Sequence, residues 1–488
     1  MKKILAIDLG ASSGRGILAS LENGKIQIEE IHRFPNNGVK VGKTLYWDII
    51  YLFDQIKQAM VKANNMGGFD FIGIDTWGVD FGIIDKNGEL VSNPVHYRDA
   101  RCDNMIEEFK NEMTLENLYD ETGIQILNFN TIFQLYYVSK YRKEQLDLAD
   151  KILFIPDLLN YFLTGVKKNE YTIASTSQML DPHKRNWNEK LLEKIGLDKE
   201  LLCDIIKPGE VVGELTDEVC EELQIEKAKV IAVGSHDTAS AVVSVPSQED
   251  DFVYISCGTW SLFGTELKEP SVTKEGMKSS YTNEGGYDGT IRYLTNIMGL
   301  WLIQESRRTW IKQGKEYSFY DLEQLALASE GFKCFIDPDY PEFGKPGDIP
   351  KRIQQYCERT NQYVPQTVGE IVRCIYESLA LKYKYSFENL KKLAGKDFKS
   401  INIVGGGTKD PLLCKMCADA CGVNVFAGPI EATALGNIAV QLIAAGEIKD
   451  LKEARKIIAN SFELKSYSSE NTEKWNEISK TYNKLMEK

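Results

Sequence analysis

A chain of 488 residues is too long for a single hydrophobic core, so two or three domains are expected. Its 58 basic and 71 acidic side chains give a net charge of −13, which argues against nucleic acid or an anionic membrane as the main partner. The apolar stretch at the N-terminus is interrupted at Asp8, too early for the core of a signal peptide, and no segment approaches the length of a membrane span. These features predict an acidic cytoplasmic protein.

Ten cysteines are too few for a disulfide framework in a chain of this length, and without an export signal they are expected to be reduced. Cys414, Cys417 and Cys421 have helical spacing, so a metal cluster is one interpretation of them. No histidine lies nearby, and the run PLLCKMCADACG has the pattern of a buried amphipathic helix. The sequence therefore favours a packed helix over a metal site at these three residues.

The first motif along the chain is AIDLGASSGR, an apolar strand that runs into a turn of small and hydroxyl residues. Gly10 and Gly14 allow a close approach of the backbone, and Ser12 and Ser13 add hydroxyl donors beside turn N–H groups that can hold oxyanions. Asp8 is placed to hold a divalent cation through water. Taken alone, the segment could also be an ordinary β-hairpin with a glycine turn.

The first half of the chain continues with alternating predicted strands and helices. Strands are expected at 25–34, 71–75, 151–156 and 229–233, and helices at 47–65, 104–109, 133–142, 156–165 and 238–243. Such alternation favours an α/β fold with a mainly parallel sheet that is covered on both faces. The polar, proline-marked stretch 246–251 is expected to be a domain boundary.

The second half of the chain repeats the opening pattern. The segment VYISCGTWS has the same order of strand, glycine, hydroxyl residue and strand, with Gly258 aligned to Gly10. A repeat at about half the chain length predicts two related domains. Further strands are expected near 253 and 401, with a long helix at 368–393. The charged segment 466–488 is expected to form a surface helix or a partly frayed end.

Three consecutive glycines, Gly405, Gly406 and Gly407, follow a predicted strand and precede a predicted helix. In that position a glycine turn can lie against phosphate or adenosine. Alone, the run could be a tight turn. Together with the two hairpins, it favours contact with a nucleotide.

Taken together, these motifs resemble the FGGY family of carbohydrate kinases, in the superfamily of actin and the heat-shock chaperone ATPases, and within that family its rhamnulokinase branch. The resemblance extends from about Ile4 to about Ala454. The ordered blocks that carry it are AIDLGASSGR, GIDTWGVDF, HYRDAR, GSHDTASAV, SCGTWSL, TNIMGLW, GGGTKD and GPIEATALGN.

The resemblance implies an α/β fold of two actin-like/RNase H-like ATPase domains that flank a deep cleft. It assigns the sugar site and the catalytic base to an N-terminal domain at 1–245, the nucleotide site to a C-terminal domain at 246–460, and a helical tail to 461–488. Similar kinases also have cysteine pairs that match Cys357 with Cys374 and Cys417 with Cys421 and that can come close enough to oxidise. In a reducing cytosol, any such bond would be incidental.

The residues GSHDT at 234–238 lie between a predicted strand and a predicted helix, where side chains can project from the end of a sheet. Phosphoryl transfer to an alcohol needs a carboxylate that orients the hydroxyl and accepts its proton, so Asp237 is the candidate base. The resemblance implies the same role for it. A helix N-cap is the alternative for Asp237, and His236 is expected to bind the substrate rather than to act as a second base.

The turn DTWGVD at 75–80 is expected to recognise the sugar. The resemblance implies that the substrate-binding residues are Gly78, His236, Asp237, Thr238 and Asn296. Xylulose kinases carry a Gly-Gln-Met-His-Gly type of sequence at the place of this turn, and its absence here argues against xylulose. Trp77 could equally be a core residue.

For the nucleotide, the resemblance implies contacts from Ala11, Ser12, Ser13, Gly14, Arg15, Thr259, Gln304 and Gly406. A magnesium ion must accompany ATP to neutralise the charge of its phosphates. Asp8 is the nearest candidate ligand for Mg²⁺, either directly or through water.

The implied activity is the ATP-dependent phosphorylation of L-rhamnulose to L-rhamnulose 1-phosphate in L-rhamnose catabolism. The expected partners are the sugar and ATP, without nucleic acid or membrane, in a monomer or small homo-oligomer. Another deoxyketose such as L-fuculose is the alternative substrate. A nucleotide switch like actin or a heat-shock chaperone would not require the polar residues of HDT and DTWGVD, and a non-catalytic sugar sensor would not require an intact Asp237.

Overall fold

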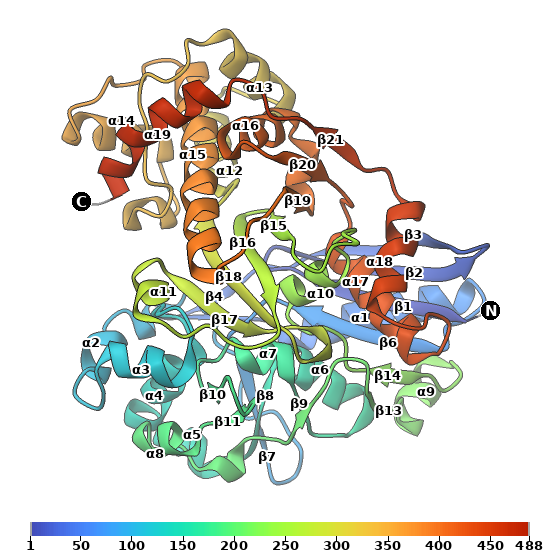
Figure 1. The fold of residues 1–488 in the computed structure, drawn as a ribbon. Coiled ribbons are helices and arrows are strands. Elements are labelled where there is room, and N and C mark those ends of the chain that lie inside the picture. Colours follow the sequence, from blue (N-terminus) through green and yellow to red (C-terminus); the bar gives the residue numbers. More distant parts are fainter. Residues whose placement is uncertain (1, 487–488) are drawn as a thin grey trace. The chain divides into compact units, whose positions relative to one another are not determined.

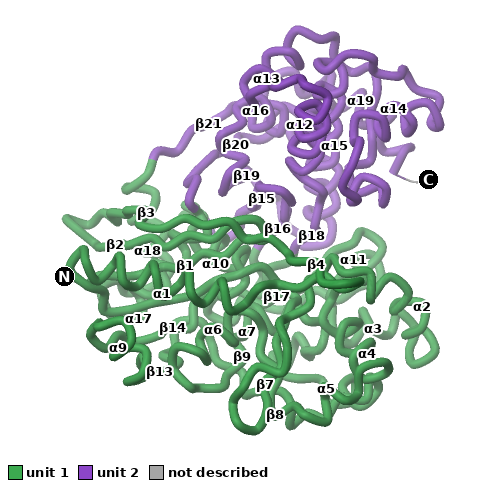
Figure 2. Tube along the Cα trace, turned by 180° about the vertical axis from the view of Figure 1, so that it is seen from behind, with its two compact units in different colours: residues 1–248, 266–293, 432–462 green, residues 249–265, 294–431, 463–488 purple. Residues whose placement is uncertain are grey.

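The computed structural model describes residues 2–486 and consists of two compact units, shown in different colours in Figure 2. The first unit comprises the chain up to Gln248 together with 266–293 and 432–462. The second unit comprises 249–265, 294–431 and the chain from Glu463 onward.

The compact units divide the chain differently from the domain limits expected from the sequence. The chain first leaves the first unit at Gln248, inside the expected boundary at 246–251, but the segments 266–293 and 432–462 return to that unit. A boundary placed at residue 245 assigned both segments to the C-terminal domain and set 461–488 apart as a tail. Contacts between residues hundreds of positions apart draw these segments back, and no local pattern reveals such contacts.

The first unit is built on a six-stranded sheet in the order β13-β14-β6-β1-β2-β3. These strands are β1 (Lys3–Leu9), β2 (Ser13–Glu22), β3 (Lys25–Pro35), β6 (Phe71–Thr76), β13 (Val211–Glu214) and β14 (Lys229–Ile231). The three central strands β14, β6 and β1 are parallel, whereas β13, β2 and β3 each run antiparallel to their neighbour. The expected parallel sheet is therefore present at the centre, with antiparallel strands on both sides of it (Figure 1).

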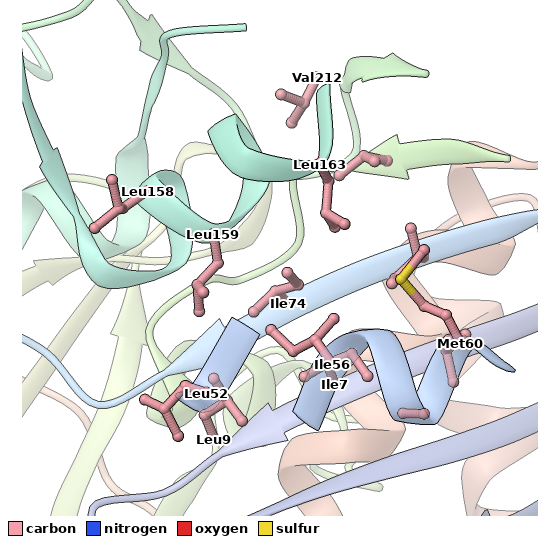
Figure 3. Close-up of a cluster of buried hydrophobic side chains, with 14 of the residues drawn as sticks. Ile7, Leu9, Leu52, Ile56, Met60, Ile74, Leu158, Leu159, Leu163 and Val212 are labelled. Carbon is pink, nitrogen blue, oxygen red and sulfur yellow. The ribbon is translucent and has the colours of Figure 1, made fainter. Parts of the chain in front are cut away.

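Helices cover both faces of this sheet because its strands are apolar on both sides. Side chains from β1 and β6 meet those of α1 (Ile49–Asn65) and α6 (Ile155–Thr164) on one face, as Figure 3 shows. Ile7 and Leu9 point to that face, while Ile4 and Ala6 belong to the core on the opposite face. That second core also contains residues of α10 (Asp237–Val243) and α17 (Ala432–Ala444). The alternation along β1 therefore directs Asp8 toward the side of α10 and α17.

Most of the remaining elements of the first unit are short. Its other strands are β4 (Val39–Val41), β5 (Thr44–Tyr46), β7 (Phe81–Asp85), β8 (Ala149–Phe154), β9 (Asn169–Glu170), β10 (Leu180–Asp181), β11 (Asn186–Trp187), β12 (Ile205–Ile206) and β17 (Tyr281–Gly285). Its other helices are α2 (Met105–Phe109), α3 (Leu115–Thr122), α4 (Thr131–Tyr141), α5 (Lys143–Leu148), α7 (Tyr171–Ser175), α8 (Glu189–Lys194), α9 (Asp217–Leu223), α11 (Lys274–Lys278) and α18 (Leu451–Ser461).

The second unit contains strands in the order β18-β16-β15-β19-β20-β21. They are β15 (Val253–Cys257), β16 (Trp260–Leu267), β18 (Ile291–Met298), β19 (Ser400–Val404), β20 (Asn424–Ala427) and β21 (Lys465–Tyr467), and β15, β19 and β20 are parallel. The helices are α12 (Trp301–Lys312), α13 (Phe319–Ala328), α14 (Ile349–Arg359), α15 (Val368–Ala394), α16 (Pro411–Cys421) and α19 (Thr472–Met486). Strands β16 and β18 each include residues of both units.

The long helix expected at 368–393 is confirmed as α15. A capping box between Thr367 and Glu370 starts it, and Gly395 ends it in the left-handed conformation at φ 64°. The expected surface helix at the C-terminus is present as α19, which buries one face: its Trp475 packs edge-on against Phe332, with ring centroids 4.9 Å apart. Among residues 2–486, no helix is both long and apolar enough to cross a membrane.

The repeat seen in the sequence has a structural counterpart. Each unit contains a strand that forms a hairpin with the next strand and pairs in parallel with a third: β1 with β2 and β6, and β15 with β16 and β19. The aligned glycines open both turns. Gly10 N donates to Ser13 O at 2.9 Å, and Gly258 N donates to Trp260 O at 2.8 Å.

Candidate active site

Three charged residues lie side by side across the first sheet. The strand register pairs Asp8 of β1 with Arg15 of β2 on one side and with Asp75 of β6 on the other. Side chains of directly paired residues project from the same face of a sheet. Arg15 donates to Asp8 Oδ2 from Nε at 3.0 Å and from Nη2 at 2.7 Å. The expected phosphate-binding hairpin thus begins beside a carboxylate, Asp8, that is paired with the guanidinium of Arg15.

Asp75 is fully buried at the end of this row. Its Oδ2 accepts a hydrogen bond of 2.6 Å from Nδ2 of Asn437 in α17, while its Oδ1 has no hydrogen-bond partner within the described part of the chain. Burial, and after it the charge of Asp8, raises the pKa of Asp75 well above its usual range. A buried oxygen without a partner commonly marks a place for a bound ion or water.

Asp237 lies at the start of α10, with its side chain 33% exposed. The N-cap of this helix is His236, so the N-cap alternative for Asp237 is wrong. Its Oδ1 accepts a hydrogen bond from Thr238 Oγ1 at 3.1 Å and lies 3.4 Å from His236 Nε2. Burial raises the pKa of Asp237, His236 acts against this shift, and the charge of Asp8 adds to it. A carboxylate with a raised pKa is better suited to accept a proton near neutral pH.

His236 is held by a buried ion pair that the sequence did not reveal. Nη2 of Arg292, a fully buried residue, lies 3.1 Å from His236 Nδ1 and 3.1 Å from Glu284 Oε2. The same Nδ1 lies 3.3 Å from Glu284 Oε2. A guanidinium only donates, so when Nδ1 accepts the hydrogen bond of Arg292, the ring proton lies on Nε2. Burial acts to raise the pKa of Glu284, but the charges and hydrogen bonds of Arg292 and His236 together outweigh it, so the pKa is lowered. His236 can therefore present an N–H toward Asp237.

Gly78 lies against this histidine. A methyl group at Gly78 would lie 3.4 Å from His236 Nε2 and 3.2 Å from Thr176 Oγ1. The next residue, Val79, has a φ of 68°, which is unusual for a β-branched side chain. Hydrogen bonds hold it there, because Val79 N donates to Thr176 Oγ1 and Thr131 Oγ1 donates to Val79 O. Such local strain is common at binding sites.

Asp80, at the end of the same turn, stabilises it through hydrogen bonds. Its Oδ2 accepts hydrogen bonds from the indole nitrogens of Trp47 at 2.6 Å and Trp77 at 3.0 Å, and its Oδ1 accepts one from Gln134 Nε2 at 2.9 Å. Burial raises the pKa of Asp80 to about 6. Trp77 is itself buried, and its ring centroid lies 4.1 Å from that of Trp47. The structural interpretation of Trp77 therefore holds.

A further buried carboxylate, Glu170, fixes the backbone of the GSHDT turn. Glu170 accepts hydrogen bonds from Ser235 N at 3.2 Å and from Thr172 Oγ1 at 2.6 Å. Thr172 Oγ1 in turn accepts a hydrogen bond from His236 N at 3.2 Å. Burial raises the pKa of Glu170 to about 7. Nothing in the sequence around Glu170 distinguishes it from a surface glutamate. Sequence reasoning also missed Thr176, Glu284, Arg292 and Asn437.

The carboxylates of this site suit a hydrated magnesium ion. Asp8 and Asp75 are register partners, and the charges of Asp8 and Asp237 each raise the pKa of Asp75. Hard oxygen ligands of this kind match Mg²⁺, which usually keeps several of its waters. Within residues 2–486, the one group of three or more Cys, His, Asp or Glu ligand atoms that all lie within 4.8 Å of one another belongs to Cys334, Cys357 and Cys374. The carboxylates are thus too far apart to enclose a bare ion.

The first hairpin presents part of the predicted nucleotide residues to solvent. Ala11 and Ser12 are exposed and Ser13 and Arg15 are half-buried. Gly14 is buried, and a methyl group there would lie 2.4 Å from the ring of Phe34. Its glycine is therefore needed for packing of the hairpin.

The second unit brings together further predicted nucleotide residues. Thr259 Oγ1 lies 3.5 Å from Oε1 of Gln304 in α12. In the glycine run, Gly405 has a φ of 85° and Gly407 packs so closely that a methyl group would lie 2.2 Å from Cys257 Sγ. Gly406 between them is exposed. The run follows β19 and precedes α16, as predicted, and leaves one glycine accessible to a ligand.

Asn296 lies in β18 of the second unit and is half-buried. Its predicted contact with the sugar stays a prediction.

All ten cysteines are free thiols, and nine of them are buried. Cys357 and Cys374, one of the two pairs noted in the sequence, lie together with Cys334. Cys414, Cys417 and Cys421 lie in the buried helix α16, as the sequence favoured.

Two family models match most of the chain. The N-terminal domain of the FGGY family of carbohydrate kinases matches residues 3–244, and the C-terminal domain of the same family matches residues 253–445. Curated relatives match nearly the whole length. A rhamnulokinase of Bacteroides thetaiotaomicron is 42% identical over 97% of this chain and 97% of its own, and a rhamnulokinase of Bacillus subtilis is 40% identical over 95% and 94%.

Solved structures show the same fold at low sequence identity. A ligand-bound xylulose kinase from Lactobacillus acidophilus gives a TM-score of 0.83 at 18% identity, covering 99% of this chain and 98% of its own. Plasmodium falciparum glycerol kinase with ADP gives a TM-score of 0.81 at 15% identity, covering 100% and 98%. The α/β fold of the two-domain sugar kinases, which is the actin-like ATPase fold, is thereby confirmed.

Proposed function

Since the chain belongs to the FGGY family of carbohydrate kinases, we propose that it transfers the terminal phosphoryl group of ATP to O1 of L-rhamnulose, a step in the breakdown of L-rhamnose. The observation that carries this proposal is the similarity to relatives named rhamnulokinase, at 38–42% identity over nearly the full chain. The turn DTWGVD, which differs from the corresponding sequence of xylulose kinases, supports the same choice of sugar.

Asp237 acts as the general base in this proposal. A kinase must orient the attacking hydroxyl and accept its proton, and a partly exposed carboxylate whose pKa is raised by burial suits both tasks. Thr238 donates to Oδ1 and so fixes the orientation of the carboxylate. The sugar O1 hydroxyl would donate to Asp237, which removes the proton as the bond from O1 to the terminal phosphorus forms and the bond from that phosphorus to the bridging oxygen breaks, with ADP as the leaving group.

His236 orients the substrate and does not take its proton. With its own proton on Nε2, it can donate to a sugar oxygen next to Asp237. Gly78 leaves room for the sugar beside this nitrogen, since a methyl group there would lie 3.4 Å away. Arg292 and Glu284 keep the imidazole ring in place. Asn296 is proposed as a further sugar contact.

Mg²⁺ fits the acidic row of the first sheet. Asp8 would hold the hydrated ion, and the unpartnered Oδ1 of Asp75 lies next along the sheet. Bound with ATP, the ion neutralises phosphate charge. Arg15 balances the charge of Asp8.

ATP contacts are proposed from Ala11, Ser12, Ser13, Gly14 and Arg15 of the first unit. The proposed contacts of the second unit are Thr259, Gln304 and Gly406, of which Thr259 and Gln304 lie 3.5 Å apart. The same proposal includes a sugar-binding domain at 1–245, a nucleotide-binding domain at 246–460, a tail at 461–488, and a cytoplasmic enzyme that works as a monomer or small homo-oligomer.

A panel of ketoses tests this function. The purified protein with MgATP should release ADP fastest with L-rhamnulose, and nuclear magnetic resonance of the product should place the phosphate on O1. L-Fuculose, D-xylulose and glycerol serve as competitors. A higher kcat/KM for L-fuculose would favour the alternative deoxyketose, and equal kcat/KM for D-xylulose would contradict the proposal.

A further inference from the structure

The first unit contains a large cavity outside the residues assigned to the sugar. Its volume is about 1030 Å³, which is at the upper end of the range for small-molecule sites. Residues between 151 and 208 form most of its wall, and 268 and 287–290 complete it. All of them belong to the first unit. None of the predicted site residues lines it.

The charge of this cavity is opposite to that of the whole chain. Seven lysine or arginine side chains line it, against three aspartate or glutamate side chains, whereas the chain as a whole carries a net charge of −13. A concave surface lined by charge of one sign concentrates the field at its centre. The cavity is therefore suited to an anion.

Three of these lysines are not neutralised by the protein. Lys151, Lys207 and Lys268 form no ion pair within the described part of the chain, although Lys151 Nζ donates to the main-chain oxygen of Glu200. The other basic residues have carboxylate partners, as Lys167 has in Asp150 at 2.8 Å. Lys207 and Lys268 are exposed and Lys151 is half-buried, so all three ammonium groups are available to an anion in the cavity.

Arg185 adds an unsatisfied donor to the same wall. It lies in the turn between β10 and β11 with a φ of 54°, a strained conformation for arginine. Its Nη2 donates to Lys268 O at 3.0 Å, which holds the guanidinium across the cavity. Its Nε is buried and has no hydrogen-bond partner among residues 2–486. Strain and an orphaned donor at one residue are typical of a site that is completed by a ligand.

We propose that this cavity is a second binding site, for a small organic anion that carries at least two phosphoryl groups. One phosphoryl group would accept from Arg185, whose planar guanidinium suits phosphate oxygens. The other would lie among Lys151, Lys207 and Lys268. The volume accommodates a ligand of that size with part of its hydration.

The cavity shares a wall with the candidate active site. Tyr171 lines the cavity, and its ring lies so close to Gly285 that a methyl group there would be 2.5 Å from the ring. Gly285 O accepts a hydrogen bond of 2.7 Å from Nε of Arg292, which in turn holds His236. We therefore expect that occupation of the cavity changes the KM for the sugar.

Calorimetry with defined probes tests the site. Pyrophosphate and a pentose bisphosphate are titrated into the full-length protein, with a saturating non-hydrolysable ATP analogue present to occupy the nucleotide residues. Both probes should bind, inorganic phosphate should bind more weakly, and the affinity should fall as salt is added. The triple variant Lys151→Gln/Lys207→Gln/Lys268→Gln should lose at least tenfold in affinity and keep the melting temperature.

The matched control is Lys25→Gln/Lys43→Gln/Lys86→Gln, three exposed lysines of the same unit with the same change in net charge. It should bind the probes as the unaltered protein does. The proposed site would be overturned if the cavity variant bound the probes as tightly as the unaltered protein does, or if the control variant lost as much affinity as the cavity variant. Arg185→Gln, which keeps the turn but removes the guanidinium, should also weaken binding. Binding that leaves the KM for the sugar unchanged would overturn the coupling through Tyr171.

Discussion

The two units contain the same arrangement of a hairpin and a parallel neighbouring strand, but only the first unit places charged side chains in it. In β1, Asp8 has Arg15 and Asp75 as its register partners. The position two residues before the aligned glycine of β15 is Ser256, where β1 has Asp8. The same backbone thus supports two different chemical surfaces.

The partners of Ser256 complete the contrast. They are Leu262 in β16 and Val404 in β19, so the second unit has no charge at any of the three matched positions. Its turn is instead followed by the glycine run, in which Gly406 is exposed. Under the proposed assignment, the carboxylates that serve proton and metal chemistry belong to one unit, while the other offers neutral groups and accessible backbone.

The largest effect is expected from a substitution of Asp237, which lies in the first unit, the one with the charged row. Asp237→Asn keeps the size of the side chain and an acceptor oxygen, but cannot accept the proton of the sugar. We expect kcat to fall by about 10²- to 10⁴-fold, the usual contribution of a positioned base. ATP binding and the melting temperature should stay the same, because the proposed phosphate contacts lie elsewhere. Steady-state kinetics, calorimetry and thermal unfolding measure the three quantities.

Asp217→Asn is the control for this variant. Asp217 is also the first residue of a short helix, α9, but it is exposed and pairs with Lys227 at 2.7 Å. It should retain full activity. Near-normal kcat in Asp237→Asn would remove this residue from the mechanism.

The matched positions Asp8 and Ser256 test whether the charge difference between the units matters for the metal. Asp8→Asn should raise the Mg²⁺ concentration needed for half-maximal activity by about 10- to 100-fold, the usual effect of altering a group that orients metal ligands. Ser256→Ala should change it less than about twofold, since a neutral position makes no ion contact. Magnesium titrations at fixed ATP compare the two variants. Equal effects at both positions would contradict the assignment of the metal to the first unit.

Part of the charged row was predictable from local patterns in the sequence. Short apolar runs identified β1 and β6, and the motifs at their ends supplied Asp8 and Asp75. The opening motif also supplied Arg15, but its pairing with Asp8 comes from the structure. The same reasoning located α15 and α16 within a few residues.

The groups that hold Asp75 and His236 in place were not predictable. Asn437 reaches Asp75 from 362 residues away, and Arg292 reaches His236 from 56 residues away. A single sequence contains no signal for such contacts, since each residue resembles an ordinary helix or strand residue in its own surroundings. The membership of 432–462 in the first compact unit rests on contacts of the same long-range kind.

Gly78 of the first unit and Gly258 of the second unit differ in the space around them. A methyl group at Gly78 would lie 3.4 Å from His236 Nε2, whereas none of the surrounding heavy atoms lies within 4 Å of one at Gly258. Gly78→Ala should therefore raise the KM for the sugar by about tenfold, equivalent to about 1.4 kcal/mol. Gly258→Ala should leave that KM unchanged. Kinetics with varied sugar at saturating MgATP decides, and an unchanged KM in Gly78→Ala would remove this turn from the sugar site.

The smallest expected effect is a shift in the pH dependence of kcat/KM for the sugar. A general base works only when deprotonated, so activity should fall as the pH is lowered through the pKa of Asp237. Burial raises this pKa above its ordinary value of 3.8, and the charge of Asp8 raises it further. Asp8→Asn removes that charge, so the pKa of Asp237 should decrease and the acidic limb should move to lower pH. The pH profiles are measured at saturating Mg²⁺, so that weaker metal binding by Asp8→Asn does not affect kcat/KM. Ser256→Ala should keep the original limb, because the neutral position of the second unit contributes no charge to Asp237. A limb that stays in place or moves to higher pH in Asp8→Asn would show that another group limits activity in acid.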